Sequence, residues 1–125
     1  MFNTLLVFVG AGVGGMCRFA FSGLNKSLKW LPLGTVLVNV VGCFCAGIVL
    51  AYVHKECMDK RVYYFLMPGF LGGFTTFSAF SGETVVLLQQ GHVTGACVNI
   101  AISVVGGLCA TALGYAVVKN MLFSW

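Results

Sequence analysis

The chain has 125 residues, of which 59% are hydrophobic and only 8% are charged, and its mean hydropathy is +0.98. A soluble domain carries about a quarter charged residues, so a water-exposed globular surface is excluded. The net charge of +4 does not indicate a nucleic-acid partner. The basic residues are scattered, mostly at the ends of apolar segments, where they suit lipid headgroups. We therefore expect a multi-pass protein of the cell membrane.

Four apolar segments, at approximately residues 2–22, 32–53, 62–88 and 93–118, take up most of the chain. Each is long enough to cross a hydrocarbon core, which needs about 20 residues per helix. The first lacks the basic region that precedes the apolar core of a signal peptide, so we expect it to be retained as a spanning helix. The sequence predicts an all-α integral membrane protein in which residues 1–125 form a single four-helix transmembrane domain.

Small residues recur four apart in the first and last segments, which predicts close helix–helix approach there. They are Gly10 and Gly14, then Gly106, Ala110 and Gly114. Five of the six cysteines lie within apolar segments, and no Cys/His cluster has the spacing of a zinc site. We interpret these cysteines as small packing residues.

The third segment is too long and irregular for one plain helix. Pro68, Gly69, Gly72 and Gly73 fall near its middle, and several hydroxyl residues follow. Proline removes a backbone donor and glycine frees the backbone dihedrals. A break in a spanning helix is tolerated only where protein, water or an ion satisfies the freed groups. We expect a helix broken mid-membrane, and a simple kink beside a hydroxyl-rich wall is the alternative.

The basic residues are divided almost evenly between the two ends of the predicted bundle. With four spans, both termini and the 54–61 link lie on one side and carry Lys55, Lys60, Arg61 and Lys119. The other side carries Lys26 and Lys29, with Arg18 at its edge. Four positive charges against three give little orientation bias under the positive-inside rule. Insertion in both orientations, and hence an antiparallel homodimer, becomes possible; the alternative is that a difference of one charge suffices.

Three polar side chains lie within the apolar segments, where such residues usually mark a pathway. Arg18 either faces a vestibule or extends to the headgroups. Glu83 either gates, binds a proton or caps the structure near the interface. Asn39, with two donors and an acceptor, either makes a helix–helix hydrogen bond or lines an ion path.

Phenylalanines recur at a spacing of three in the third segment, at Phe74, Phe77 and Phe80. Such stripes are usually packing, but the positive edge of a phenyl ring also suits an anion. Thr76, Phe80 and Glu83 share one helix face, where polar and aromatic contacts alternate.

Three stretches carry a more specific signal, which extends over essentially the whole chain. They read GGMCRF at residues 14–19, PLGTVLVNVVGCF at 32–44 and GFLGGFTTFSAFS at 69–81. In content, order and spacing they resemble the signature of the Fluc/CrcB family of fluoride channels. The resemblance implies an antiparallel dual-topology homodimer with two fluoride pores. It also implies a structural sodium ion at the dimer interface, held by backbone carbonyls of Gly72 and Thr75.

The resemblance also implies which residues line the anion pathway. Phe77 and Phe80 match the pore phenylalanines, Asn39 matches the pore asparagine, and Arg18 matches a basic residue near the vestibule. The remaining candidates share a polar side chain and would lie along the same pore: Thr76, Ser78, Glu83 and Ser103. Two positions depart from the family pattern. Ala79 stands where many members carry a hydroxyl, and Asn99 stands where a tyrosine is frequent.

The leading hypothesis is a fluoride-selective passive channel that exports fluoride from the cytoplasm and lowers its toxicity. It requires no ATP, and the sequence contains no phosphate-binding loop. An enzyme is not expected, since no nucleophile–base set is visible. A dual-topology proton-coupled exporter of small molecules that uses Glu83, and a non-transporting membrane assembly subunit, are the alternatives.

Overall fold

The computed structural model describes residues 1–122, and its regular structure is entirely helical over that range. Labels with η mark one 3-10 turn (η1) and two π-helical segments (η2 and η3). In chain order the elements are α1 (Phe2–Ser22), η1 (Gly23–Lys26), α2 (Leu33–His54), α3 (Lys60–Tyr64), η2 (Phe65–Leu71), α4 (Gly72–Phe74), α5 (Phe77–Gln89), α6 (Val93–Ala101), η3 (Ile102–Gly106) and α7 (Gly107–Leu122).

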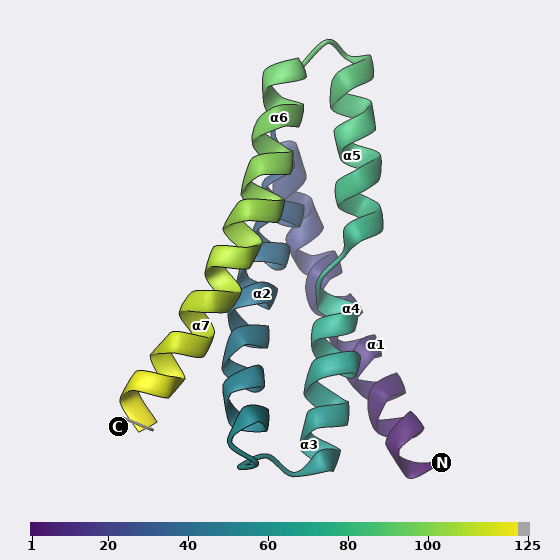
Figure 1. Ribbon diagram of the computed structural model, residues 1–125. Coiled ribbons are helices and arrows are strands. Elements are labelled where there is room, and N and C mark those ends of the chain that lie inside the picture. The colour runs from purple at the N-terminus through teal and green to yellow at the C-terminus, as the bar shows by residue number, and fades with distance from the viewer. Residues whose placement is uncertain (123–125) are drawn as a thin grey trace.

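These elements form four helical stretches that are long and apolar enough to cross a membrane. Their bounds are Phe2–Lys26, Leu33–His54, Lys60–Gln89 and Val93–Met121. The prediction of an all-α protein with four apolar spans is therefore confirmed. Figure 1 shows both termini at the same end of the molecule as the connection from α2 to α3.

The third span changes partners along its length. Its first half, η2 with α4, packs against α1, whereas α5 packs mainly against α6. The second span, α2, packs chiefly along α7 and also contacts α1. In Figure 1 the chain steps sideways between α4 and α5, and α5 then rises beside α6. This step lies at the centre of the molecule and positions the candidate site.

Glycines allow the helices to come into backbone contact. A Cβ on Gly14 would overlap the backbone of Phe70 and Phe74, which places α1 directly on η2 and α4. A Cβ on Gly47 would likewise overlap the carbonyl of Thr111, so the backbones of α2 and α7 are also in contact. Such close approach lets van der Waals packing hold helices together in lipid, where water supplies no driving force.

The third span is interrupted, as predicted, but a few residues beyond its proline. Pro68 lies within η2, where the helix widens to π geometry and continues past the missing proline donor. The interruption comes instead at Thr75 and Thr76, which are both extended. The fourth span also contains a π-helical segment, at Ile102–Gly106.

Candidate functional site

The break in the third span is held by the side chain of Asn39 on α2. The Thr76 N–H donates to Asn39 Oδ1 at 2.7 Å, and Asn39 Nδ2 donates to the Thr76 carbonyl at 3.0 Å. One amide thus satisfies both backbone groups of a residue that belongs to neither helix. Gly42, one turn further along α2, lies directly beneath the Thr75 methyl group, so the extended segment rests closely on α2.

Thr76 also starts the next helix. Its hydroxyl accepts a hydrogen bond from the Ala79 N–H at 3.2 Å and therefore caps the N-terminus of α5. The same hydroxyl lies 3.2 Å from Ser78 Oγ. Thr75 caps the preceding helix, since its hydroxyl donates to the Leu71 carbonyl at 2.9 Å. The two threonines thus cap the helix on each side of the break.

The carbonyls of Gly72 and Thr75 are among those that lose their helical donors at the break. In a continuous helix the Thr76 N–H would donate to the Gly72 carbonyl, and the Ala79 N–H to the Thr75 carbonyl. Here those N–H groups donate to Asn39 and to the Thr76 hydroxyl instead. Within residues 1–122, no group of three or more His, Cys, Asp or Glu side chains is placed to hold a metal ion.

A cavity of about 200 Å³ opens beside the break. Its lining is uncharged and comes from α2, the third span and η3: Asn39, Cys43, Thr75, Thr76, Phe77, Phe80, Ser103 and Val104. The Phe77 and Phe80 rings lie 5.4 Å apart between centroids. Phe80 is 8% exposed and forms part of the wall, whereas Phe77 is 77% exposed on the single chain. Five of the predicted pathway residues thus surround one cavity: Asn39, Thr76, Phe77, Phe80 and Ser103. Ser78 is not part of the lining, but its hydroxyl is hydrogen-bonded to that of Thr76.

Glu83 lies apart from that cavity, although it shares a face with Phe80 in the sequence pattern. Its Oε1 accepts hydrogen bonds from Asn25 Nδ2 at 2.8 Å and from Thr35 Oγ1 at 2.7 Å. Asn25 Oδ1 in turn accepts from the Thr35 N–H at 3.1 Å. These contacts tie α5 to η1 and to the first turn of α2.

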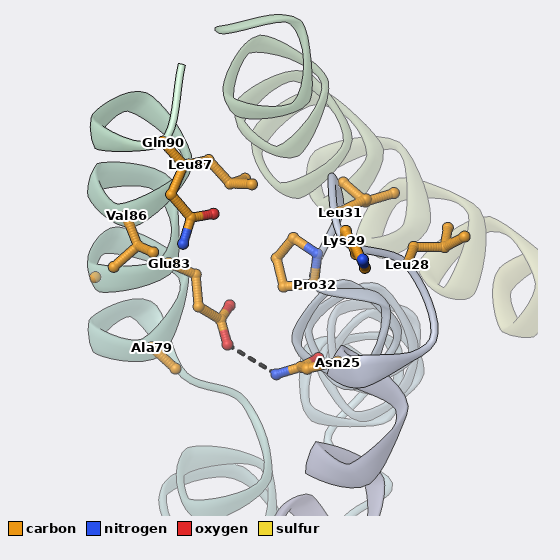
Figure 2. Close-up of a pocket in the computed structure, with 11 residues that line it drawn as sticks. Asn25, Leu28, Lys29, Leu31, Pro32, Ala79, Glu83, Val86, Leu87 and Gln90 are labelled. Carbon is orange, nitrogen blue, oxygen red and sulfur yellow. Dashed lines mark hydrogen bonds between the residues drawn. The ribbon is translucent and has the colours of Figure 1, made fainter. Parts of the chain in front are cut away.

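Figure 2 shows Glu83 pointing across a second cavity towards Asn25, with Pro32 on the same side of that cavity as Asn25. This cavity measures about 460 Å³, and Lys29 is also part of its lining. Asn25 and Thr35 were not predicted from the sequence as partners of Glu83. Thr35 lies within one of the three motifs and could have been found there, but Asn25 gave no such signal.

Asn99 and Ser103 lie on the fourth span and Arg18 on the first. Asn99 on α6, which was noted only as a departure from a family pattern, is fully buried and donates to Thr84 Oγ1 at 2.9 Å. Ser103 lies one turn later and lines the smaller cavity. Arg18 is half-buried on α1 and lines neither cavity.

Comparison with known proteins identifies the family of this chain. The family model described as "CrcB-like protein, Camphor Resistance (CrcB)" matches residues 5–115. The chain belongs to the CrcB-like family. Similar members include "Fluoride-specific ion channel FluC 1" of Yersinia pseudotuberculosis serotype I (strain IP32953), 46% identical over 123 residues, which span 96% of this chain and 97% of that protein.

Two other CrcB-like proteins carry the name "Fluoride-specific ion channel FluC". The one from Methylobacillus flagellatus is 43% identical over 125 residues, with 95% of this chain and 96% of that protein covered. The one from Coxiella burnetii (strain Dugway 5J108-111) is 37% identical over 123 residues, with 95% and 99% covered. These relatives are ion channels and not enzymes, and the similarity extends through all four spans.

Proposed function

We propose that this protein is a fluoride-selective passive ion channel that exports fluoride from the cytoplasm. The observation that carries the proposal is the placement of Asn39, Phe77 and Phe80 around one uncharged cavity at a helix break, in a chain whose CrcB-like relatives are named fluoride-specific channels. Fluoride enters cells as the neutral acid and is trapped as the anion, so a passive path down its gradient lowers its toxicity.

The cavity offers an anion weak partners in place of a fixed positive charge. A phenyl edge carries partial positive charge, and hydroxyls of Thr76 and Ser103 can donate. Asn39 has two amide hydrogens, and the Thr76 carbonyl takes one of them. Binding of this kind is strong enough to admit the ion and weak enough to release it, as conduction requires.

The other two candidates would act towards the ends of the same path. Arg18 would attract the anion at a vestibule, and Glu83 would lie beyond Phe80 and Ser78 on the polar track. Glu83 does not line the smaller cavity, and it would act on the path from its cluster with Asn25 and Thr35.

The functional unit would be an antiparallel homodimer with dual topology. The nearly even division of basic residues supports insertion in both orientations. The outward face of α5 supports a partner, because it exposes large apolar side chains in the single chain: Phe77, Val85 and Leu88. A second copy covering this face would bury Phe77 and close the pore wall.

A structural sodium ion at the dimer interface fits the residues at the break. The Gly72 and Thr75 carbonyls would hold it, since both have lost their helical donors to other acceptors. Hard cations prefer oxygen ligands, and the bound ion would neutralise backbone oxygens that are otherwise costly in lipid.

Fluoride efflux from proteoliposomes tests the proposal. Vesicles containing the purified protein are loaded with fluoride, and a potassium gradient with valinomycin sets the potential while an electrode records release. We expect fast fluoride efflux with little chloride efflux, strong reduction in Phe80→Ile and no reduction in Phe8→Ile, which changes an exposed ring on α1. No flux, or equal flux of chloride, would contradict the proposal.

The same vesicles distinguish the two alternatives. A proton-coupled exporter would move protons with a substrate and lose that movement in Glu83→Gln. An assembly subunit would show no flux when purified alone and would copurify with another membrane protein.

A further inference from the structure

Asn99 lies behind the wall of the smaller cavity and not in it. Its side chain is fully buried, and it is not among the residues that line the cavity. A buried amide in a spanning helix must have partners, and the principal one is Thr84 on α5, whose hydroxyl accepts from Asn99 Nδ2 at 2.9 Å.

The direction of this hydrogen bond is fixed by Thr84. A hydroxyl has a single hydrogen, and Thr84 donates it to the Phe80 carbonyl at 2.7 Å. The lone pairs of the hydroxyl are therefore available to Asn99. On the other side, Ser103 Oγ lies 3.5 Å from Asn99 Oδ1, at the limit of a hydrogen bond. A polar chain thus runs from Ser103 through Asn99 and Thr84 to Phe80, and both its ends line the cavity.

The segment that carries Phe80 is tied to α2 and η1 through Glu83 on one side and to the fourth span on the other. After the break, α5 packs mainly on α6, and its outward side chains are exposed in the single chain. Within residues 1–122, the bond from Asn99 to Thr84 is the side-chain hydrogen bond that joins α5 to α6. It meets α5 one turn beyond Phe80, at the residue that bonds the Phe80 carbonyl.

We propose that Asn99 is a positioning residue that acts through Thr84 to hold Phe80 at the wall of the fluoride path. The inference rests on the proposed function and deepens it: the fourth span sets the pore geometry from behind, by hydrogen bonding to α5. The sequence departure at Asn99 thereby acquires a specific role.

The test combines isosteric and conservative substitutions. Asn99→Leu removes the donor, Thr84→Val removes the hydroxyl with little change of shape, and Thr84→Ser keeps the hydroxyl. Asn120→Leu, at an exposed position on α7, is the matched control. We expect fluoride efflux rates per active vesicle to fall about three- to twenty-fold in the first two variants, the range expected for interhelical hydrogen bonds in a membrane protein. Thr84→Ser and Asn120→Leu should retain the parent rate.

A double-mutant cycle separates positioning from general stabilisation. If Asn99 acts through Thr84, the double variant Asn99→Leu/Thr84→Val conducts about as well as either single variant. A purely structural role would lower the fraction of active vesicles and leave the rate of each one unchanged. Unchanged rates in Asn99→Leu, or losses that multiply in the double variant, would overturn the inference.

A measurement without transport keeps the inference independent of the proposed function. In lipid nanodiscs, the NMR signals of the Phe80 ring should shift in Asn99→Leu and Thr84→Val and stay in place in Thr84→Ser and Asn120→Leu. Unmoved Phe80 signals in all four variants would overturn it even if the protein conducts fluoride. Absence of fluoride flux in the parent protein, with the expected Phe80 shifts, would contradict only the proposed function.

Discussion

Replacing Asn39 by leucine should destabilise the protein more than any other change of similar size on α2. The amide accepts from the Thr76 N–H and donates to the Thr76 carbonyl, and Thr76 is buried. Leucine fills a similar volume but leaves both backbone groups without partners. A buried unsatisfied donor or acceptor costs about 1–3 kcal/mol, so we expect a loss of about 2–6 kcal/mol in the free energy of unfolding from the two groups together.

Asn39→Asp tests the two hydrogen bonds to Thr76 separately, because it can keep the bond from the Thr76 N–H and must lose the bond to the Thr76 carbonyl. A carboxylate keeps an acceptor for the Thr76 N–H but sets a second acceptor against the Thr76 carbonyl, so we expect a loss of at least the roughly 1–3 kcal/mol of one unsatisfied buried group. It also places negative charge at the cavity and should abolish fluoride flux while the fold persists. Unfolding in mixed detergent micelles measures stability, with Asn120→Leu as control. An Asn39→Leu variant as stable as that control would refute the assignment of the break to this amide.

Two further predictions concern helix contact and helix capping. Gly14→Ala should lower the free energy of unfolding by about 1–3 kcal/mol through overpacking, because its Cβ would overlap the backbone of Phe70 and Phe74. Gly12→Ala is the control: its Cβ would have no atom within 4 Å, so its stability should be unchanged or slightly higher. Thermal unfolding followed by size-exclusion chromatography compares the two variants. Thr76→Val should lower stability by about 1 kcal/mol through loss of the α5 cap, and Thr76→Ser should retain it; equal stability of the two variants would show that the hydroxyl does not cap α5.

The spans could be predicted from the sequence because apolar length alone decides them. The site of the break could not. Proline and glycine residues weaken a helix locally, yet η2 absorbs Pro68 by widening. The interruption lies at Thr76 because Asn39, 37 residues earlier, takes its N–H. Local propensity is overruled here by a tertiary hydrogen bond, which no spacing in the third segment reveals.

The candidate site was partly predictable for a related reason. Asn39, Phe77, Phe80 and Ser103 were identified by motif resemblance, and they surround one cavity. Periodicity placed Glu83 on the same helix face as Phe80, but its partners come from other parts of the chain. Asn25 lies 58 residues before it. One-dimensional spacing can locate a side chain on its own helix, whereas the choice of partner depends on how the helices pack.

The break connects the proposed sodium site with the proposed fluoride path. By taking the Thr76 N–H, Asn39 removes the helical donor of the Gly72 carbonyl, and the Thr76 hydroxyl removes that of the Thr75 carbonyl. The same rearrangement turns α5 away from α1 and towards α6, which brings Phe80 against Asn39 and Ser103. Carbonyl oxygens suited to a cation and an uncharged wall suited to an anion therefore arise from one departure from helical geometry. A variant that restored a continuous helix should lose both features together.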